Sequence, residues 1–528
     1  MSTASDAAGA TPYTNTTVFP TEVAEEQPSA LERWRRLAGA VGAPAAFLTT
    51  WLLTEGALDP KGRNMAAALV AVAVLWVTEA LPLAVTAIVG PTLCVLLGVA
   101  DAKTALAPFA DPIVFLFIGS FILAQAMMLH GLDKRVALAF LQAPWIGGHP
   151  LRVLAGLGAV TAIVSMWISN TATAAMMLPV GLGLLQVLQQ ARHNAEGSSL
   201  RSWPFASGMM LMIAYAASIG GIGTPVGSPP NLIAIGLIRS LAGVEISFFR
   251  WMSLAVPMLL VMGIALYFLL RRLHPVGAIS HDAADRLQEY LVRQRASVGR
   301  WTVGQINTAV CFAVAVSLWV LPGILSAVLP AEHPVLRFFA ARMPEAVAAV
   351  VAASLLFVLP VNLRQLRFTI TWEEAAKIDW GTILLFGGGL SLGKMMFDTG
   401  VADAMGRGVT GLIGASSLWT LTAVAIALGI LLSELTSNTS AANMVIPVVI
   451  ALAQAAGVDP VPPALGACFG ASFGFMLPVS APPNAIVYGS GLVPITKMIR
   501  AGVLFDLLGF FLIFGSLRVL CPVLGLAH

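Results

Sequence analysis

A polar triplet, Ser-Asn-Thr, occurs at residues 169–171 and again at residues 437–439, each time inside a long apolar stretch. Another serine lies four residues before each triplet, at Ser165 and Ser433. A membrane helix that meets such a cluster must bury it against protein or line an aqueous cavity with it, because unsatisfied polar groups are costly in lipid. Two copies of the cluster predict a transporter made of two internal repeats, with its binding site where the repeats meet.

The duplication extends beyond the triplets. Each copy is followed by a break rich in small residues and proline that ends in Pro-Pro-Asn, at residues 227–231 and 480–484. Upstream, Phe-Ile-Gly at residues 117–119 matches Phe-Gly-Gly at residues 386–388, with an offset of 269 residues against 268 for the triplets. Ordered matches over so long a stretch indicate a true repeat. The two repeats are expected to cover residues 64–275 and 300–528.

The composition is that of an integral membrane protein. Of the 528 residues, 58% are hydrophobic and 10% charged, against about 25% charged residues in soluble domains. The long runs of Leu, Val, Ala, Ile and Phe favour an all-α fold over an outer-membrane barrel. The net charge of +3 gives no reason to expect a nucleic-acid partner. The four scattered cysteines do not have the spacing of metal ligands. No candidate nucleophile has a general base within reach, so an enzyme is not expected.

Eleven apolar stretches are candidates for membrane crossings: 37–54, 64–83, 84–100, 111–131, 205–240, 248–270, 304–330, 344–362, 380–400, 461–495 and 501–524. Two more, 151–191 and 416–456, are interrupted by the triplets. Each of these is either two crossings or a re-entrant hairpin that enters the membrane and returns. The hairpin suits a polar break that must be wrapped by protein.

The distribution of positive charge predicts the orientation. With Arg33, Arg35 and Arg36 in the cytoplasm and both triplet stretches re-entrant, most loop lysines and arginines fall on the inside. The outside keeps few of them: Lys61, Arg63, Lys103, Arg337 and Arg342, with the side of Arg407 left open. This asymmetry predicts a cytoplasmic N-terminus, about 11 transmembrane helices and two inverted repeats.

The clusters suit a cation and an anion together. Broken helices leave N–H groups that attract anions and carbonyl groups that attract cations. Hydroxyl, amide and carbonyl oxygens are ligands for hard cations such as Na+. No Lys or Arg lies beside either cluster in the sequence, and Glu434 is the one nearby acid, with a proton, cation or purely structural role left open. The competing interpretation is that such residues only join helices, which the duplication disfavours.

The paired triplets, each followed by a Pro-Pro-Asn break, resemble the divalent anion/sodium symporter family of dicarboxylate, citrate and sulfate carriers. The resemblance covers nearly the whole chain after residue 37. It implies a homodimer in which a transport domain moves against a scaffold domain as an elevator. The implied division is a disordered cytoplasmic tail (1–36), scaffold (37–150 and 304–415), transport domain (151–275 and 416–528, each with a hairpin and a broken helix) and cytoplasmic connector (276–303).

The same resemblance implies which residues bind. One sodium site would use Ser165, Ser169, Asn170 and Gly227, and the other Ser433, Ser437, Asn438 and Ser480. The substrate carboxylates would meet Asn170, Thr171, Ser228, Asn438, Thr439 and Pro482. Two departures from the family pattern, Ser480 and Ala481, can alter substrate choice.

The sequence therefore predicts a secondary active transporter of C4-dicarboxylates (succinate, malate, fumarate) or similar divalent anions, driven by Na+. It is expected in the inner (plasma) membrane as a multi-pass homodimer in the lipid bilayer, with a small anionic substrate. A sodium-independent dicarboxylate exchanger, a citrate or sulfate carrier, and a receptor with a transporter fold that binds without carrying are the alternatives. The preferred anion and the ion stoichiometry are not encoded in any motif.

Overall fold

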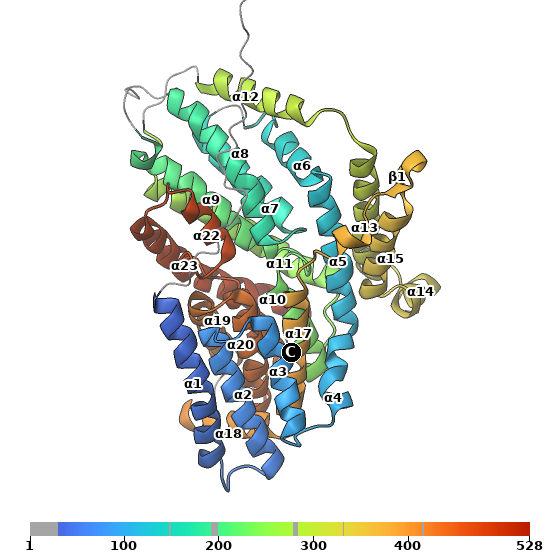
Figure 1. The fold of residues 1–528 in the computed structure, drawn as a ribbon, viewed down its shortest axis with the longest axis vertical. Coiled ribbons are helices and arrows are strands. Elements are labelled where there is room, and N and C mark those ends of the chain that lie inside the picture. Colours follow the sequence, from blue (N-terminus) through green and yellow to red (C-terminus); the bar gives the residue numbers. More distant parts are fainter. Residues whose placement is uncertain are drawn as a thin grey trace, which may run out of the picture.

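The computed structural model describes residues 30–146, 149–191, 199–277, 283–330, 332–413 and 417–527. Over these residues the chain is almost entirely helical, which confirms the predicted fold class (Figure 1). The exception is a short antiparallel ribbon of β1 (Pro360–Asn362) and β2 (Arg367–Phe368). The predicted tail at 1–36 lies mostly outside the described residues. Its predicted C-terminal boundary is wrong, because helix α1 already begins at Ala30.

The first half of the chain forms these elements: α1 (Ala30–Leu53), α2 (Pro60–Thr78), α3 (Leu83–Leu96), α4 (Ala102–Leu106), η1 (Ala107–Ala110), α5 (Pro112–Leu129), α6 (Leu132–Leu141), α7 (Pro150–Ser165), α8 (Asn170–Gln190), η2 (Leu200–Ser202), α9 (Pro204–Gly221), α10 (Pro229–Leu237), η3 (Ile238–Ala242) and α11 (Phe248–Leu273). Here η1 and η2 are 3₁₀ turns and η3 is a π turn.

The second half forms α12 (Ala283–Val298), α13 (Val303–Val328), α14 (Pro334–Arg342), α15 (Glu345–Val358), the β ribbon with the 3₁₀ turn η4 (Leu363–Gln365) between its strands, α16 (Trp372–Ala375), α17 (Trp380–Asp398), α18 (Val401–Ile413), α19 (Leu418–Leu435), α20 (Asn438–Ala455), α21 (Val461–Ala471), α22 (Pro482–Gly489) and α23 (Ile495–Val523).

The chain is a multi-pass membrane protein. Among the described residues, nine helices are long and apolar enough to cross a membrane, or ten if the pair α14–α15, bent by 72°, is one span. Helices α3, α7 and α21 are apolar but shorter. The nine include α8, α19 and α20, which border the triplets, so length alone permits either a crossing or a re-entrant hairpin there. The number of crossings and the orientation stay predictions.

Two of the candidate spans are broken at the Pro-Pro-Asn motifs, where the sequence predicts a break. The span at 205–240 divides into α9 and α10, and the span at 461–495 divides into α21 and α22. Both second helices begin with Pro-Pro-Asn, where a missing N–H at the first helical position costs nothing. The chain before α10 is irregular and buried, whereas the chain before α22 is irregular and buried only in part, with Val479 80% exposed. Where such backbone is buried in a membrane protein, other groups must satisfy it.

The matched upstream segments adopt the same local structure. Helices α5 and α17 begin after aspartates, Asp111 and Asp379, whose carboxylates accept hydrogen bonds from the first-turn N–H groups. Both helices are followed by a glycine with positive φ, +65° at Gly131 and +70° at Gly400. Only glycine adopts that conformation without strain, which explains why the repeat keeps it. The symmetry relation between the repeats remains a prediction.

A matched pair of glycines also allows close helix contacts. A Cβ at Gly119 would lie 2.7 Å from Cβ of Ala349, so α5 and α15 touch through their backbones there. A Cβ at Gly388 would lie 2.3 Å from the carbonyl oxygen of Ala87, where α17 meets α3. Small residues are the usual means by which membrane helices pack, because lipid provides no hydrophobic drive.

The broken helices lie at the centre of the molecule. The membrane-length window of α9 is 94% buried, and every residue of α21 is buried. Helix α9 packs against α7, α8 and α11, whereas α21 packs against α19, α20 and α23. Helices α12 and α14 are additions that the sequence analysis did not expect. Helix α12 forms much of the connector and lies across one end of the molecule, against α6 and α8 (Figure 1).

Candidate functional site

The first triplet lies at the short connection between helices α7 and α8. Helix α7 ends at Ser165 and α8 begins at Asn170. Ser169 caps α8, because its hydroxyl accepts a hydrogen bond from the N–H of Ala172 at 3.2 Å. The triplet thus sits at a helix N-terminus, where unpaired N–H groups and the helix dipole attract negative charge.

Three oxygen atoms meet around Ser165. Its hydroxyl oxygen lies 2.8 Å from Oδ1 of Asn170 and 2.6 Å from the carbonyl oxygen of Ala217. A hydroxyl has one proton, so it can donate fully to only one of these acceptors. A group of neutral oxygens with fewer protons than acceptors is a suitable environment for a hard cation.

The break between α9 and α10 wraps around the same connection. The hydroxyl of Thr224 donates to the carbonyl oxygen of Met166 and accepts the N–H of Gly227 at 3.2 Å. Nδ2 of Asn231 donates to the carbonyl oxygens of Gly221 and Thr224 at 2.8 Å and 2.7 Å. These side chains satisfy carbonyl groups that a continuous helix would pair internally.

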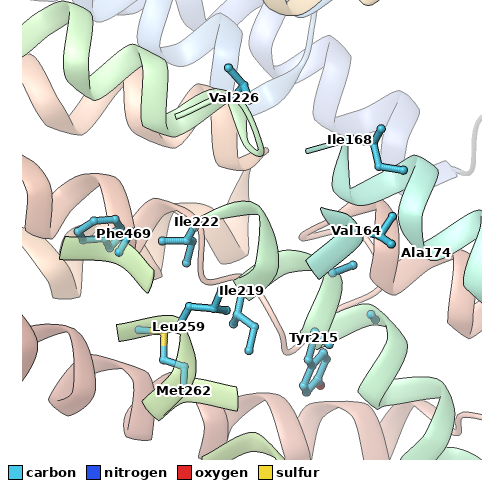
Figure 2. Packing of buried hydrophobic residues seen from close by; sticks show 14 of the residues in the cluster. Val164, Ile168, Ala174, Tyr215, Ile219, Ile222, Val226, Leu259, Met262 and Phe469 are labelled. Carbon is cyan, nitrogen blue, oxygen red and sulfur yellow. The ribbon is translucent and has the colours of Figure 1, made fainter. Parts of the chain in front are cut away.

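Apolar side chains hold the two segments together. Figure 2 shows Val164, at the end of α7, and Ile168, in the connection to α8, in the same buried cluster as Ile222 and Val226 from the break. A rigid apolar surround of this kind fixes the positions of the polar groups that it encloses.

The second triplet repeats this geometry. Ser433 Oγ lies 2.9 Å from Oδ1 of Asn438, and the hydroxyl of Ser437 accepts the N–H of Ser440 at 3.2 Å to cap α20. Nδ2 of Asn484 donates to the carbonyl oxygens of Gly474 and Leu477 at 2.8 Å and 3.0 Å. The duplication in sequence is therefore a duplication of hydrogen bonding.

The two halves differ in how the break is tied to the triplet. In the second half Leu477 replaces Thr224, and it is Ser480 whose hydroxyl contacts the equivalent backbone carbonyl, that of Glu434, at 3.2 Å. The Glu434 carboxylate adds contacts that the first half lacks: Oε1 accepts the N–H of Met476 at 2.8 Å, and Oε2 accepts the hydroxyl of Ser480 at 2.6 Å. Of the roles left open for Glu434, the structure shows the structural one: its carboxylate stabilises the conformation of the break through these two hydrogen bonds.

The predicted site residues divide into an inner and an outer group. Those predicted to bind only sodium are mostly buried: Ser165, Gly227, Ser433 and Ser480, whereas Ser437 is half-buried and Ser169 exposed. Those predicted to contact substrate are more open: Asn170, Asn438 and Thr439 are half-buried, Thr171 and Pro482 exposed, and Ser228 alone buried.

Packing between the halves is crosswise. Helix α22, which follows the second break, packs against α8 and α9, while α10, which follows the first break, packs against α20 and α21. Each triplet therefore begins a helix that touches the broken helix of the other half. The structure brings Ser165 together with Asn170, and Ser433 with Asn438, and no hydrogen bond among the described residues joins the two triplets.

Several participating groups were missed by the sequence analysis. Thr224 and Ala217 belong to no repeated motif, so the hydroxyl of one and the carbonyl of the other could not be identified from the sequence. Asn231 and Asn484, in contrast, are the last residues of the repeated Pro-Pro-Asn motif. The interpretation of Glu434 as the one acid near the site is wrong, because Asp506 on α23 lies beside it in the fold. A lone acid within an apolar run was the available signal for Asp506.

We expect Asn231→Ala to destabilise the protein by about 2–4 kcal/mol, because two buried carbonyl groups lose their donor. Asn484→Ala should cost a similar amount. Thermal unfolding of the purified variants in detergent measures the effect as a lowered Tm. Asn64→Ala is the control and should cost less, because the two hydrogen bonds that it removes, from Nδ2 to the carbonyl of Leu97 and from Trp51 Nε1 to Oδ1, are only partly buried. Equal Tm values for all three variants would contradict this role.

Known proteins resemble this chain along nearly its whole length. It is 32% identical over 497 residues to a sodium-dependent dicarboxylate transporter, SdcS, of Staphylococcus saprophyticus, covering 93% of this chain and 92% of that protein. It is 34% identical over 456 residues to the sodium-dependent high-affinity dicarboxylate transporter 3 of Caenorhabditis elegans, covering 82% of this chain and 78% of the relative.

A solved structure shares the fold. The YdaH transporter of Alcanivorax borkumensis superposes with a TM-score of 0.53 at 13% identity, over 80% of this chain and 88% of that one. The family described as "Sodium:sulfate symporter transmembrane region" matches residues 34–526. The expectations of a transporter and not an enzyme, and of this family, are confirmed. The chain belongs to the sodium:sulfate symporter family of membrane transporters.

Proposed function

We propose that this protein is a secondary active transporter that moves C4-dicarboxylates across the membrane together with Na+. The relatives named above are sodium-dependent dicarboxylate transporters. The observation that carries the proposal is the duplicated oxygen cluster, Ser165 with Asn170 and Ser433 with Asn438, each at the N-terminus of a partly buried helix. A cation and an anion can bind side by side at such a point.

Each asparagine serves both ligands. Oδ1 of Asn170 faces the Ser165 hydroxyl and completes an inner sodium site with Ser169 and the carbonyl of Gly227. The Nδ2 group of the same side chain can then donate a hydrogen bond to a substrate carboxylate. In the second half Asn438 does the same, with Ser433, Ser437 and Ser480 on the sodium side.

The substrate site is the outer layer of the same structure. Its contacts are Asn170, Thr171 and Ser228 from one half and Asn438, Thr439 and Pro482 from the other. The first turns of α8 and α20 add N–H groups and positive dipole ends. None of these residues is a Lys or Arg, so the charge of a dicarboxylate is balanced chiefly by bound Na+. That balance is what couples the two ligands, because neither binds well alone.

Transport requires the site to open to each side in turn. In the proposed division, residues 151–275 and 416–528 form a transport domain that moves as an elevator against a scaffold of 37–150 and 304–415. A homodimer in the plasma membrane, with a cytoplasmic N-terminus, completes the proposal. Ser480 places a hydroxyl and Ala481 a methyl group next to the proposed substrate contact Pro482, and both are expected to tune which anion is preferred.

Labelled succinate uptake into proteoliposomes of purified protein tests this function. Accumulation that requires an inward sodium gradient is the expected result. Uptake that ignores sodium and requires internal dicarboxylate would replace the symporter by an exchanger. Binding without any uptake would indicate a receptor. Citrate and sulfate, offered in place of succinate, show whether the anion class is assigned correctly.

A further inference from the structure

A buried pair of acids lies behind the second break. Glu434 is 3% exposed and Asp506 is 5% exposed. The Asp506 carboxyl lies within interaction reach of the Glu434 carboxyl and the backbone of Phe475. Neither Asp506 oxygen accepts a hydrogen bond of normal length from a donor among the described residues. Aromatic rings of Tyr215, Phe475 and Phe505 pack around this point.

Among the described residues, no Lys or Arg forms an ion pair with either acid. Helix α23, which carries Asp506, packs against α11, α19 and α21. The arginines of α11 and α23 other than Arg250 are exposed, away from the buried pair: Arg271, Arg272, Arg500 and Arg518. On α9, the Tyr215 hydroxyl donates to the carbonyl of Phe475. On α11, Arg250 binds the carbonyls of Leu524 and Gly525, and on α23 itself Lys497 contacts Ser207. From α19 comes Glu434, and from α21 the thiol of Cys468, which faces Pro230.

Two adjacent buried carboxyl groups without a cation do not both carry charge, because like charges repel strongly at low dielectric. Glu434 already accepts two hydrogen bonds, from Met476 and Ser480. The arrangement that avoids two adjacent negative charges is a neutral Asp506 whose O–H donates a hydrogen bond to the Glu434 carboxylate. This adds a third hydrogen bond to Glu434 and fixes its orientation.

We propose that Asp506 is a positioning residue for the second cation site: it orients Glu434, and Glu434 orients Ser480 and the backbone at Met476. The comparison between the halves supports this. In the first half the Thr224 hydroxyl ties the break directly to the carbonyl of Met166. In the second half Leu477 has no hydroxyl, and Ser480 contacts the equivalent carbonyl of Glu434 at 3.2 Å but the Glu434 carboxylate at 2.6 Å. The closer contact therefore depends on the orientation of the Glu434 side chain.

The inference rests on the proposed sodium coupling and is tested through sodium dependence. Asp506→Ala should raise the sodium concentration for half-maximal succinate uptake about tenfold, because a buried charged acceptor loses its donor. Asp506→Asn should restore the wild-type value, since the amide N–H replaces the acid O–H. Sodium-induced stabilisation in thermal melts gives the same comparison without transport. Asp133→Ala, which removes a buried acid on α6, is the matched control and should leave the sodium dependence unchanged.

If Asp506→Ala does not fold, the double variant Glu434→Gln/Asp506→Ala should recover expression, because it removes the unpaired buried charge. A normal sodium dependence in Asp506→Ala overturns the proposal. So does an equal loss in Asp506→Ala and Asp506→Asn, which would assign the effect to charge and not to orientation. Failure of the proposed function is recognised separately, because wild-type uptake would then show no sodium dependence.

Discussion

Asn170→Ala and Asn438→Ala are each expected to lower sodium-driven succinate uptake by about 100-fold or more, through the combined loss of a cation ligand and an anion donor. Each asparagine is placed at a helix N-terminus by a capping serine and oriented by a second, buried serine. Alanine removes both functional atoms of the side chain. It leaves the buried hydroxyls of Ser165 and Ser433 without their Oδ1 partner.

The loss should concern binding more than folding. Both asparagines are only half-buried, so expression and size-exclusion profiles of the variants are expected to match the wild type. Asn307→Ala is a suitable control, because Asn307 donates to Pro360 and Thr369 outside the proposed site. It should retain sodium-driven uptake. Undiminished uptake by both Asn170→Ala and Asn438→Ala would rule out the site.

Gly227→Ala is expected to reduce uptake at least about tenfold and to lower the Tm, since overpacking of a filled interior costs about 1–3 kcal/mol. A Cβ there would lie 2.6 Å from the carbonyl oxygen of Gly221, 2.8 Å from that of Met166 and 3.0 Å from that of Ser165. Backbone atoms cannot turn aside as a flexible side chain can. The break and the hairpin tip must therefore separate, which displaces the proposed sodium ligands.

Gly263→Ala provides the matched control for this variant. Gly263 lies on α11, and a Cβ added there meets no atom within 4 Å. Uptake and Tm should both stay at wild-type values. Paired measurements of uptake and thermal unfolding separate the two effects of Gly227→Ala. If Gly227→Ala transports normally, the close approach of the break to the hairpin tip is not required for function.

The two halves also differ in how much each depends on the backbone. The first break has a hydroxyl-to-carbonyl contact from Thr224 and a glycine with no room for a side chain. In the second, a serine stands at the position of that glycine, and it contacts both the carbonyl and the buried carboxylate of Glu434. Repeats that share hydrogen-bonding geometry can thus diverge in what supports it, and the substitutions with the largest effect are expected to differ between the halves.

Much of the architecture followed from the sequence because its causes are local. Apolar composition and the lack of alternation determine membrane helices, and Pro-Pro-Asn and the capping serines determine where helices restart. Glycines at Gly131 and Gly400 mark helix ends for the same reason. The pairing of each serine with its asparagine was also accessible, since only one short connection separates them in the chain.

What the sequence by itself determined is therefore the fold class, the duplication and the residues at the two helix starts. Only the tertiary structure decided which distant groups complete them: the carbonyl of Ala217, the hydroxyl of Thr224 and the carboxyl of Asp506. It also decided the crosswise packing of α10 and α22 on the opposite half. The physical reason is that these contacts join segments far apart in the chain, and no periodicity or local propensity records which buried polar groups will meet.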